Sequence, residues 1–208
     1  MKIRVAEKKD YISIAKIHYF SRELLGSGFF SLTNKFFLRK YYKILLQDQD
    51  FVVMCVEDKE KRIIGFVSAS LDAQKQFKTL SKHKFSLGLT LIPSILLRPT
   101  FLFDILRRYR SSIGKNKERF VNVKGARGEF WVWDVRYKNP LWAIKLYQSH
   151  LRFLQKLGLE KMFFEVDIEN KKILSFHQKN GAKTNEKYLL PDGRERILMY
   201  YDLKDLHL

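Results

Sequence analysis

The sequence predicts one mixed α/β domain in which helices flank a central sheet. Three observations support this prediction. Residues 128–182 read strand, turn, helix, strand, helix; hairpin patterns stand on both sides of that run; and a chain of 208 residues with 46% apolar content contains no Pro-, Gly- or Ser-rich linker. We therefore expect the range 1–208 to fold around one core.

The N-terminal part predicts a strand followed by two helices. Residues 2–6 (KIRVA) form the strand, Asp10 is a candidate N-cap of the first helix, and residues 33–46 form the second helix. Between the helices, residues 26–30 (GSGFF) form a loop whose two Phe side chains either join the core or line a pocket. Burial in the core is the simpler interpretation.

Two hairpins are predicted, one on each side of the central run. Residues 51–57 and 62–70 are joined by a polar Asp-Lys-Glu-Lys turn, and residues 187–190 and 196–203 are joined through Pro-Asp-Gly. Cys55 lies among apolar neighbours in the first hairpin, so we interpret it as a small core residue and not as a nucleophile.

Residues 71–124 form a long segment that we expect to be a helical insertion. Residues 85–97 carry no charge, but thirteen residues broken by Pro93 are too few to span a bilayer. We expect two short helices hinged between Pro93 and Pro99. Two roles stay open: the insertion covers the sheet, or residues 85–110 lie on an anionic membrane surface, because a basic run follows the apolar one.

The central run predicts two strands joined by a helix. Residues 128–135 (GEFWVWDV) and 161–167 (KMFFEVD) have strand composition, and apolar residues recur at helical spacing over 142–157. Asn170 is a candidate cap for a second helix that Gly181 ends. Two strands connected through a helix in one sheet are parallel, with a right-handed crossover.

The charge balance predicts an anionic partner. Forty Lys and Arg against 22 Asp and Glu give a net charge of +18, which suits nucleic acid, an acidic membrane face or a phosphorylated ligand. The charged N-terminus lacks the apolar core of a secretory signal, and the single Cys forms no internal disulfide. These features favour a cytoplasmic protein. The histidines lack metal-ligand spacing, so we expect no metal.

The turn at residues 136–141 is a candidate anion site, because the first turn of a helix presents unpaired N–H groups and the positive end of the helix dipole. At this turn the sequence resembles the GNAT superfamily of acyl-CoA N-acyltransferases. Tyr137 to Ala143 stand in the register of that family's Tyr-Arg-Gly-x-Gly-Ile-Gly segment. Asn170, His177 and the Gly181-Ala182 pair keep the spacing of the second half of its signature.

The resemblance implies a mostly antiparallel sheet of six to seven strands with one splayed parallel pair. It implies acetyl-CoA as co-substrate, with pantetheine between the splayed strands and the pyrophosphate on the following turn. The residues implied for these contacts are Trp133, Asp134 and Val135 on the strand, Lys138, Asn139, Leu141, Trp142 and Ala143 in the turn, and Asn170 at the second helix.

The sequence departs from the family at the residues that matter most for binding and catalysis. Asn139, Leu141 and Ala143 replace three glycines that let the backbone approach the pyrophosphate, and Pro140 removes one N–H donor. His177 replaces the Tyr that usually protonates the leaving thiolate, and its ordinary pKa suits an acid near neutral pH.

In the resembled family the general base often lies on the central strand. The resemblance therefore implies Glu129 as the first choice and Glu165, on the neighbouring strand, as the second. Strand alternation places Glu129 and Asp134 on opposite faces, so only one of them faces a given pocket. A salt bridge with some of the many basic residues is the alternative role of each carboxylate.

The sequence thus predicts an N-acetyltransferase that moves an acetyl group from acetyl-CoA to a primary amine of a small molecule. A phosphorylated or nucleotide-linked amino sugar is one candidate acceptor, and polyamines fit least well because a chain at +18 repels a polycation. The alternative is a non-catalytic module that binds acyl-CoA or, less readily, nucleic acid on the same fold. The oligomeric state is not readable from the sequence.

Overall fold

The computed structural model describes residues 1–25, 28–113, 125–137, 139–190 and 192–206. Its described strands form one seven-stranded sheet in the order β1-β2-β3-β4-β5-β7-β6. The strands are β1 (Lys2–Val5), β2 (Phe51–Glu57), β3 (Ile63–Ser70), β4 (Ala126–Trp133), β5 (Lys161–Asp167), β6 (Lys183–Leu189) and β7 (Glu195–Asp202). All neighbours are antiparallel except β4 and β5, which are parallel. The predicted fold class is confirmed.

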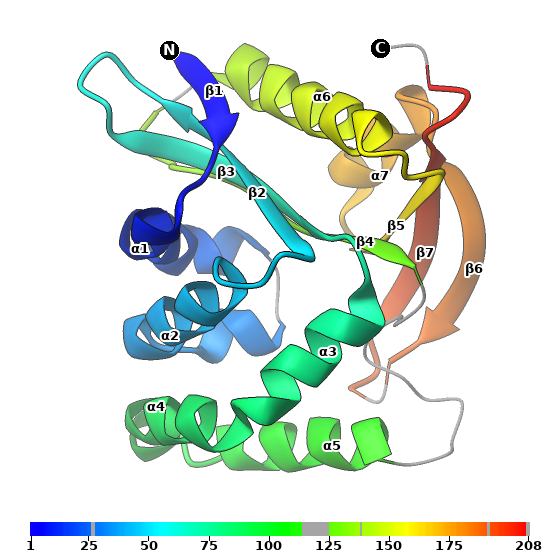
Figure 1. Cartoon of the computed structure of the whole chain (residues 1–208). Coiled ribbons are helices and arrows are strands. Elements are labelled where there is room, and N and C mark those ends of the chain that lie inside the picture. The colour runs from blue at the N-terminus through cyan, green and yellow to red at the C-terminus, as the bar shows by residue number, and fades with distance from the viewer. Residues whose placement is uncertain (26–27, 114–124, 138, 191, 207–208) are drawn as a thin grey trace.

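Helices cover both faces of this sheet (Figure 1). The α-helices are α1 (Tyr11–Ser21), α2 (Lys35–Leu45), α3 (Ala73–Lys82), α4 (Lys84–Leu97), α5 (Phe101–Ile113), α6 (Pro140–Lys156) and α7 (Lys171–Lys179). Short 3-10 turns stand at Lys8–Asp10, Arg22–Leu25 and Phe29–Leu32. In Figure 1, α6 and α7 lie on one side of the sheet, while α1 and α2 lie on the other.

Side-chain caps begin several of these helices. Asn34 caps α2, Asp72 caps α3 and Asn170 caps α7, each by accepting hydrogen bonds from N–H groups of the first turn. Asp10 stands at the predicted N-cap position of α1, but its side chain makes no capping hydrogen bond there. Asp10 instead accepts hydrogen bonds from Arg4 at 2.6 Å and from the Glu7 N–H at 2.7 Å, because it lies beside β1.

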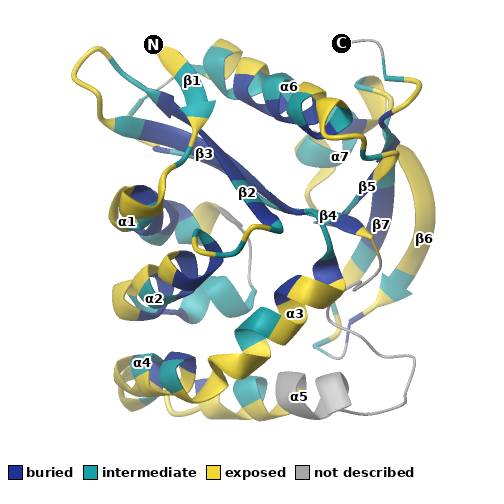
Figure 2. Ribbon diagram, viewed as in Figure 1, coloured by how far each residue is buried: buried dark blue, intermediate teal, exposed yellow. Residues whose placement is uncertain are grey.

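Each face of the sheet has its own apolar cluster (Figure 2). The cluster toward α1 and α2 includes Phe66 and Val132, and Phe29 and Phe30 pack against it. The simpler interpretation of that loop is therefore confirmed for its two Phe residues. The other cluster, toward α6 and α7, contains Leu146, Leu151 and Tyr201, among others. The sheet is thus the middle layer of three.

The insertion consists of three helices in its described part, not two. The chain does not hinge at Pro93, since α4 runs through that residue to Leu97. The side-chain amide of Asn34 donates hydrogen bonds to the Thr90 carbonyl and the Ser94 hydroxyl, both at 2.8 Å. These bonds anchor the proline turn of α4 to the start of α2, and the break falls after Leu97, within the hinge range predicted between Pro93 and Pro99.

The parallel strands β4 and β5 diverge soon after they begin. Only Ala126 with Met162, and Arg127 with Phe163, are paired across them. Beyond these pairs β4 continues along β3, while β5 continues along β7. The sheet is therefore open between β4 and β5 over most of the length of both strands.

In the part of the chain that the structure describes, no helix is long and apolar enough to cross a membrane.

Candidate active site at the opening between β4 and β5

A bulge in β4 sets the direction of the side chains at the opening. Ser68 of β3 pairs with Phe130, but the next residue, Ala69, pairs with Gly128. Glu129 is thus an extra residue in β4, and the Phe130 N–H is bonded by the Ser68 hydroxyl oxygen at 3.2 Å.

The bulge overturns one prediction. Because it adds one residue, the alternation along β4 changes phase, and Glu129 and Asp134 do not face opposite sides. Glu129 lies near Tyr41 of α2, and the charge of Lys16 on α1 acts on Asp134. Both carboxylates therefore belong to the α1/α2 side of the sheet.

Glu129 is a buried carboxylate with one close counter-charge. Its Oε1 lies 3.1 Å from Nη1 of Arg127, and its side chain lies near Gln76 and Tyr41. Burial raises the pKa of Glu129 above its ordinary value, and the positive charge of Arg127 opposes that rise. A carboxylate with a raised pKa is a stronger base than an exposed one, which suits proton abstraction.

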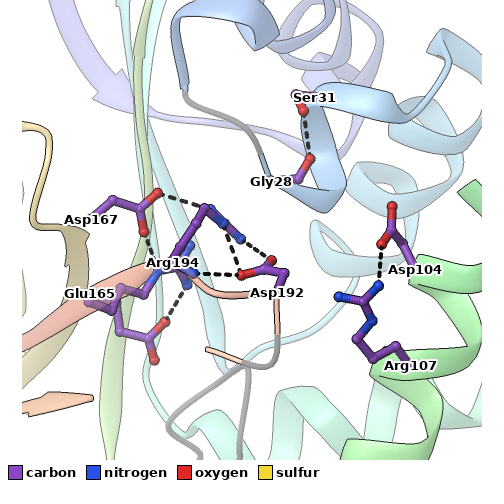
Figure 3. Close-up of polar contacts among 9 residues, drawn as sticks. Gly28, Ser31, Asp104, Arg107, Glu165, Asp167, Asp192 and Arg194 are labelled. Atoms are coloured by element: carbon purple, nitrogen blue, oxygen red, sulfur yellow. Dashed lines mark hydrogen bonds and ion pairs between the residues drawn. The ribbon is translucent and has the colours of Figure 1, made fainter. Parts of the chain in front are cut away.

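A ladder of alternating charges continues from Arg127 toward β5 and β7, and Figure 3 shows its members Glu165, Asp167, Asp192 and Arg194. Glu165 lies between Arg127, at 3.6 Å, and Arg196, at 3.2 Å. Further ion pairs join Asp167 to Arg196 at 2.5 Å and to Arg194 at 2.9 Å, and Arg194 to Asp192 at 2.8 Å. We call these residues, from Arg127 to Asp192, the charged ladder.

The ladder ends beside the loop that precedes α2. A Cβ placed on Gly28 would lie 3.8 Å from Nη1 of Arg194, and the Ser31 hydroxyl bonds the Gly28 carbonyl at 2.6 Å (Figure 3). Of the ladder residues, only Glu165 was predicted from the sequence as a site residue. The sequence does contain a pattern that indicates the ladder: Glu165 and Asp167 stand two apart on β5, as Arg194 and Arg196 do at the start of its partner β7.

His177 lies on the other face of the sheet from Glu129. It projects from α7 among the rings of Tyr147, Phe164 and Tyr201, with its Nδ1 2.9 Å from the Tyr201 hydroxyl. Burial lowers the pKa of His177 to about 4. The imidazole is therefore neutral at pH 7 and can give or accept a hydrogen bond, but it carries no imidazolium proton to donate.

Aromatic side chains fill the α6/α7 side of the opening. The Trp131 ring of β4 lies 4.7 Å from that of Tyr147 and 4.9 Å from that of Phe176, measured between centroids. The Trp131 Nε1 is buried and has no hydrogen-bond partner among the described residues. The two candidate catalytic residues, Glu129 and His177, lie on opposite faces of the sheet.

In the turn before α6, groups of the chain itself make the hydrogen bonds at the start of the helix. Asn139 caps α6 by accepting a hydrogen bond from the Trp142 N–H at 3.3 Å, and its carbonyl accepts one from Ala143 at 3.3 Å. Pro140 occupies the first position of the helix, where a missing N–H costs little. Leu141 is 70% exposed. The predicted contact at Lys138 lies outside the described residues.

The end of β4 makes contacts of its own at the positions predicted for pantetheine. The Trp133 carbonyl accepts a hydrogen bond from Ser21 at 3.0 Å, and the Asp134 N–H donates to Ile64 at 2.8 Å. The Asp134 carboxylate pairs with Arg136 at 2.6 Å, and this bond lowers the pKa of Asp134. Val135 is exposed, and the side chain of Asn170 caps α7.

Solved structures with the same arrangement are acetyltransferases. A point mutant of the spermidine N-acetyltransferase SpeG from Vibrio cholerae aligns with 98% of this chain and 96% of its own, at 15% identity and a TM-score of 0.58. An aminoglycoside 6'-acetyltransferase type Ii aligns with 98% of this chain and 97% of its own, at 11% identity and a TM-score of 0.56. A protein described as an acetyltransferase aligns over 98% and 100%, at 12% identity and a TM-score of 0.59.

These likenesses show that the chain has the GNAT fold along almost its whole length. At 11–15% identity they show the fold alone. No protein-family model and no curated protein matches the sequence.

Proposed function

We propose that this chain is an N-acetyltransferase that moves an acetyl group from acetyl-CoA to a primary amine of a small molecule. The observation that carries the proposal is the opening between β4 and β5, which only two residue pairs close at its base. It connects a face that holds a buried carboxylate with a face that holds α6, α7 and a neutral imidazole. A thioester that enters from the second face meets an amine that enters from the first.

The reaction at this opening balances without a metal. Glu129, directly or through a water, takes a proton from the acceptor ammonium, and the nitrogen lone pair attacks the acetyl carbon. An N–H group of β4 stabilises the oxyanion, and as the C–S bond breaks the positively charged nitrogen loses its second proton to water, which leaves the neutral amide product. The thiolate takes its proton from water, while neutral His177 donates a hydrogen bond to it.

The charged ladder supports an acceptor that carries both an ammonium and an anionic group. Its carboxylates suit the ammonium, and Arg194, near the Gly28 loop, suits a phosphate. A phosphorylated or nucleotide-linked amino sugar has both groups. Rates with an amino sugar phosphate, its dephosphorylated form, spermidine and an aminoglycoside test this choice. A preference for spermidine contradicts it.

Acetyl-CoA binding is the first test. Isothermal titration of acetyl-CoA should show micromolar binding that Leu141→Glu abolishes, since a carboxylate at the start of α6 repels the pyrophosphate. Leu157→Glu is the matched control, because Leu157 is exposed at the opposite end of the same helix. No binding to the unmodified protein contradicts the proposal.

Turnover separates the enzyme from a binding module. Glu129→Gln should lower kcat by a factor of about 10² to 10⁴ and leave acetyl-CoA affinity unchanged. His177→Gln should lower kcat less, because it removes a hydrogen bond and not the base. Acetyl-CoA binding without release of free thiol, with any amine, favours the non-catalytic alternative. Affinity for nucleic acid that falls steeply with salt, without thiol release, favours the nucleic-acid module.

A further inference from the structure

Helices α4 and α5 each expose several large apolar side chains. On α4, Phe85 is 79% exposed and Leu96 is 76% exposed. We call the exposed apolar side chains of the two helices the apolar face; they are Phe85, Leu89, Ile92, Leu96 and Leu97 on α4, and Leu102, Phe103 and Leu106 on α5. Figure 2 shows α4 at the outer edge of the molecule, away from the sheet.

The apolar face is not needed to hold α4 in place. A different side of the helix packs toward α2, through Leu87 and Leu91, and the Asn34 bonds fix it there. Phe85, Leu89, Ile92 and Leu96 follow one another at three- and four-residue steps, so they share the outward side of the helix. Soluble monomers rarely expose an apolar patch of this extent unless it binds something.

Basic residues surround the apolar face. Residues 73–113 contain eight Lys and Arg and a single acidic residue, Asp104. Lys82 and Lys84 stand exposed at the start of α4, and Arg98 stands exposed at its end. Asp104 pairs with Arg107 at 3.6 Å, so its negative charge is compensated within α5 (Figure 3).

We propose that this face docks on an anionic lipid surface, with α4 and α5 lying in the plane of the interface. The argument is charge complementarity: the rim attracts acidic headgroups, and the aliphatic and aromatic side chains enter the acyl boundary. The 14 residues of α4 span about 21 Å, less than the roughly 30 Å of a hydrocarbon core. Both helices therefore lie on the bilayer and do not cross it.

A second copy of the chain fits the face less well. Two copies facing each other would bring together two basic rims of a protein that already carries +18. An acidic lipid surface removes that repulsion, whereas a dimer increases it. The proposal is independent of the acetyltransferase activity, because it rests on α4 and α5 alone.

Vesicle flotation of the full chain tests the proposal. We expect the protein to float with vesicles of phosphatidylcholine containing about a third phosphatidylglycerol, and to stay in the lower fraction with phosphatidylcholine alone. Raising the salt concentration to about 0.5 M should weaken binding, since it screens the rim. Equal flotation with both kinds of vesicle, or with neither, overturns the proposal.

A pair of matched variants locates the contact. Leu89→Gln combined with Leu96→Gln should lower the partition coefficient on acidic vesicles at least tenfold. Ile12→Gln combined with Leu157→Gln is the control, because these exposed side chains lie on α1 and at the end of α6. Circular dichroism should show both pairs folded, as the replaced side chains are exposed. Equal loss in both pairs, or a dimer in solution that only the α4 pair dissociates, contradicts lipid as the occupant.

Discussion

The guanidinium of Arg127 lies 3.1 Å from the carboxylate of Glu129, within the same strand and next to a bulge. Both side chains are almost fully buried. The two residues stand two positions apart in β4, so strand alternation places both side chains on the α1/α2 side, where Glu129 lies near Tyr41 and Gln76. The pair keeps a charged carboxylate in an interior where burial favours the protonated form.

Removing Arg127 should therefore be costly at neutral pH. Arg127→Leu leaves Glu129 and Glu165 without their shared counter-charge, and we expect the free energy of unfolding to fall by about 3–5 kcal/mol. The loss should shrink as the pH falls through the pKa of Glu129, which burial raises above its ordinary value, because the carboxyl group is then protonated. Urea unfolding at pH 7 and pH 5 measures both effects. A loss that is equal at the two pH values contradicts this account.

Gly65 makes room for Trp133 across the β3–β4 pair. A Cβ at Gly65 would clash with the Trp133 ring, because it would lie 2.3 Å from Cε3. Gly65→Ala should lower the free energy of unfolding by about 1–3 kcal/mol through overpacking. Gly88→Ala is the control, because nothing lies within 4 Å of a Cβ there and Ala favours a helix by about 0.5–1 kcal/mol. Thermal unfolding should show opposite shifts for the two variants.

His150 should make the protein less stable in acid. It is fully buried on α6, neither ring nitrogen has a hydrogen-bond partner among the described residues, and burial lowers its pKa to about 3. The unfolded chain binds this proton near pH 6.5, so stability is complete above that pH and falls by about 1.4 kcal/mol per pH unit down to about pH 3.

His150→Leu should remove that slope and leave stability at pH 7 unchanged or higher, since it replaces a buried polar group without partners. Urea unfolding between pH 7 and pH 4 provides the comparison. His177→Leu should remove a slope of the same sign that ends near pH 4, where the pKa of His177 lies. An unchanged pH dependence in His150→Leu contradicts the burial of a neutral imidazole.

Asn139 should compete with the pyrophosphate of acetyl-CoA. Its side chain occupies the Trp142 N–H, which an anion at the start of α6 would otherwise bind. Asn139→Gly removes this competitor, and Gly costs a helix cap only a few tenths of a kcal/mol. We expect acetyl-CoA to bind several-fold more tightly to the variant in calorimetry. Asn170→Gly, which removes the corresponding cap of α7, is the control; equal gains in both variants contradict the idea.

Much of this fold could be predicted because the patterns were local. Residues 161–167 have the bounds expected from their composition, and the Asn170 cap needs only its own first turn. The continuous path of α4 through Pro93 could not be predicted, because it depends on Asn34, which is distant in the sequence. Long-range bonds of this kind leave no periodic signal.

The opening between β4 and β5 could be predicted from the strand, turn and helix order, but the contacts around it could not. The bulge at Glu129 could not be predicted from the sequence, because it depends on how β3 pairs with β4 and no residue type requires it. The burial of His177 could not be predicted either, because a lone His on an amphipathic helix is as compatible with the surface as with the core.

The short pairing between β4 and β5 also divides the molecule mechanically. Strands β1 to β4 exchange backbone bonds among themselves, as do β5 to β7, but only Ala126–Met162 and Arg127–Phe163 join the two groups. The sheet thus has a seam, held at one end and open at the other. A bound molecule with amide groups of its own would supply the missing hydrogen bonds across that seam. It would thereby couple the two loosely joined halves of the sheet rigidly.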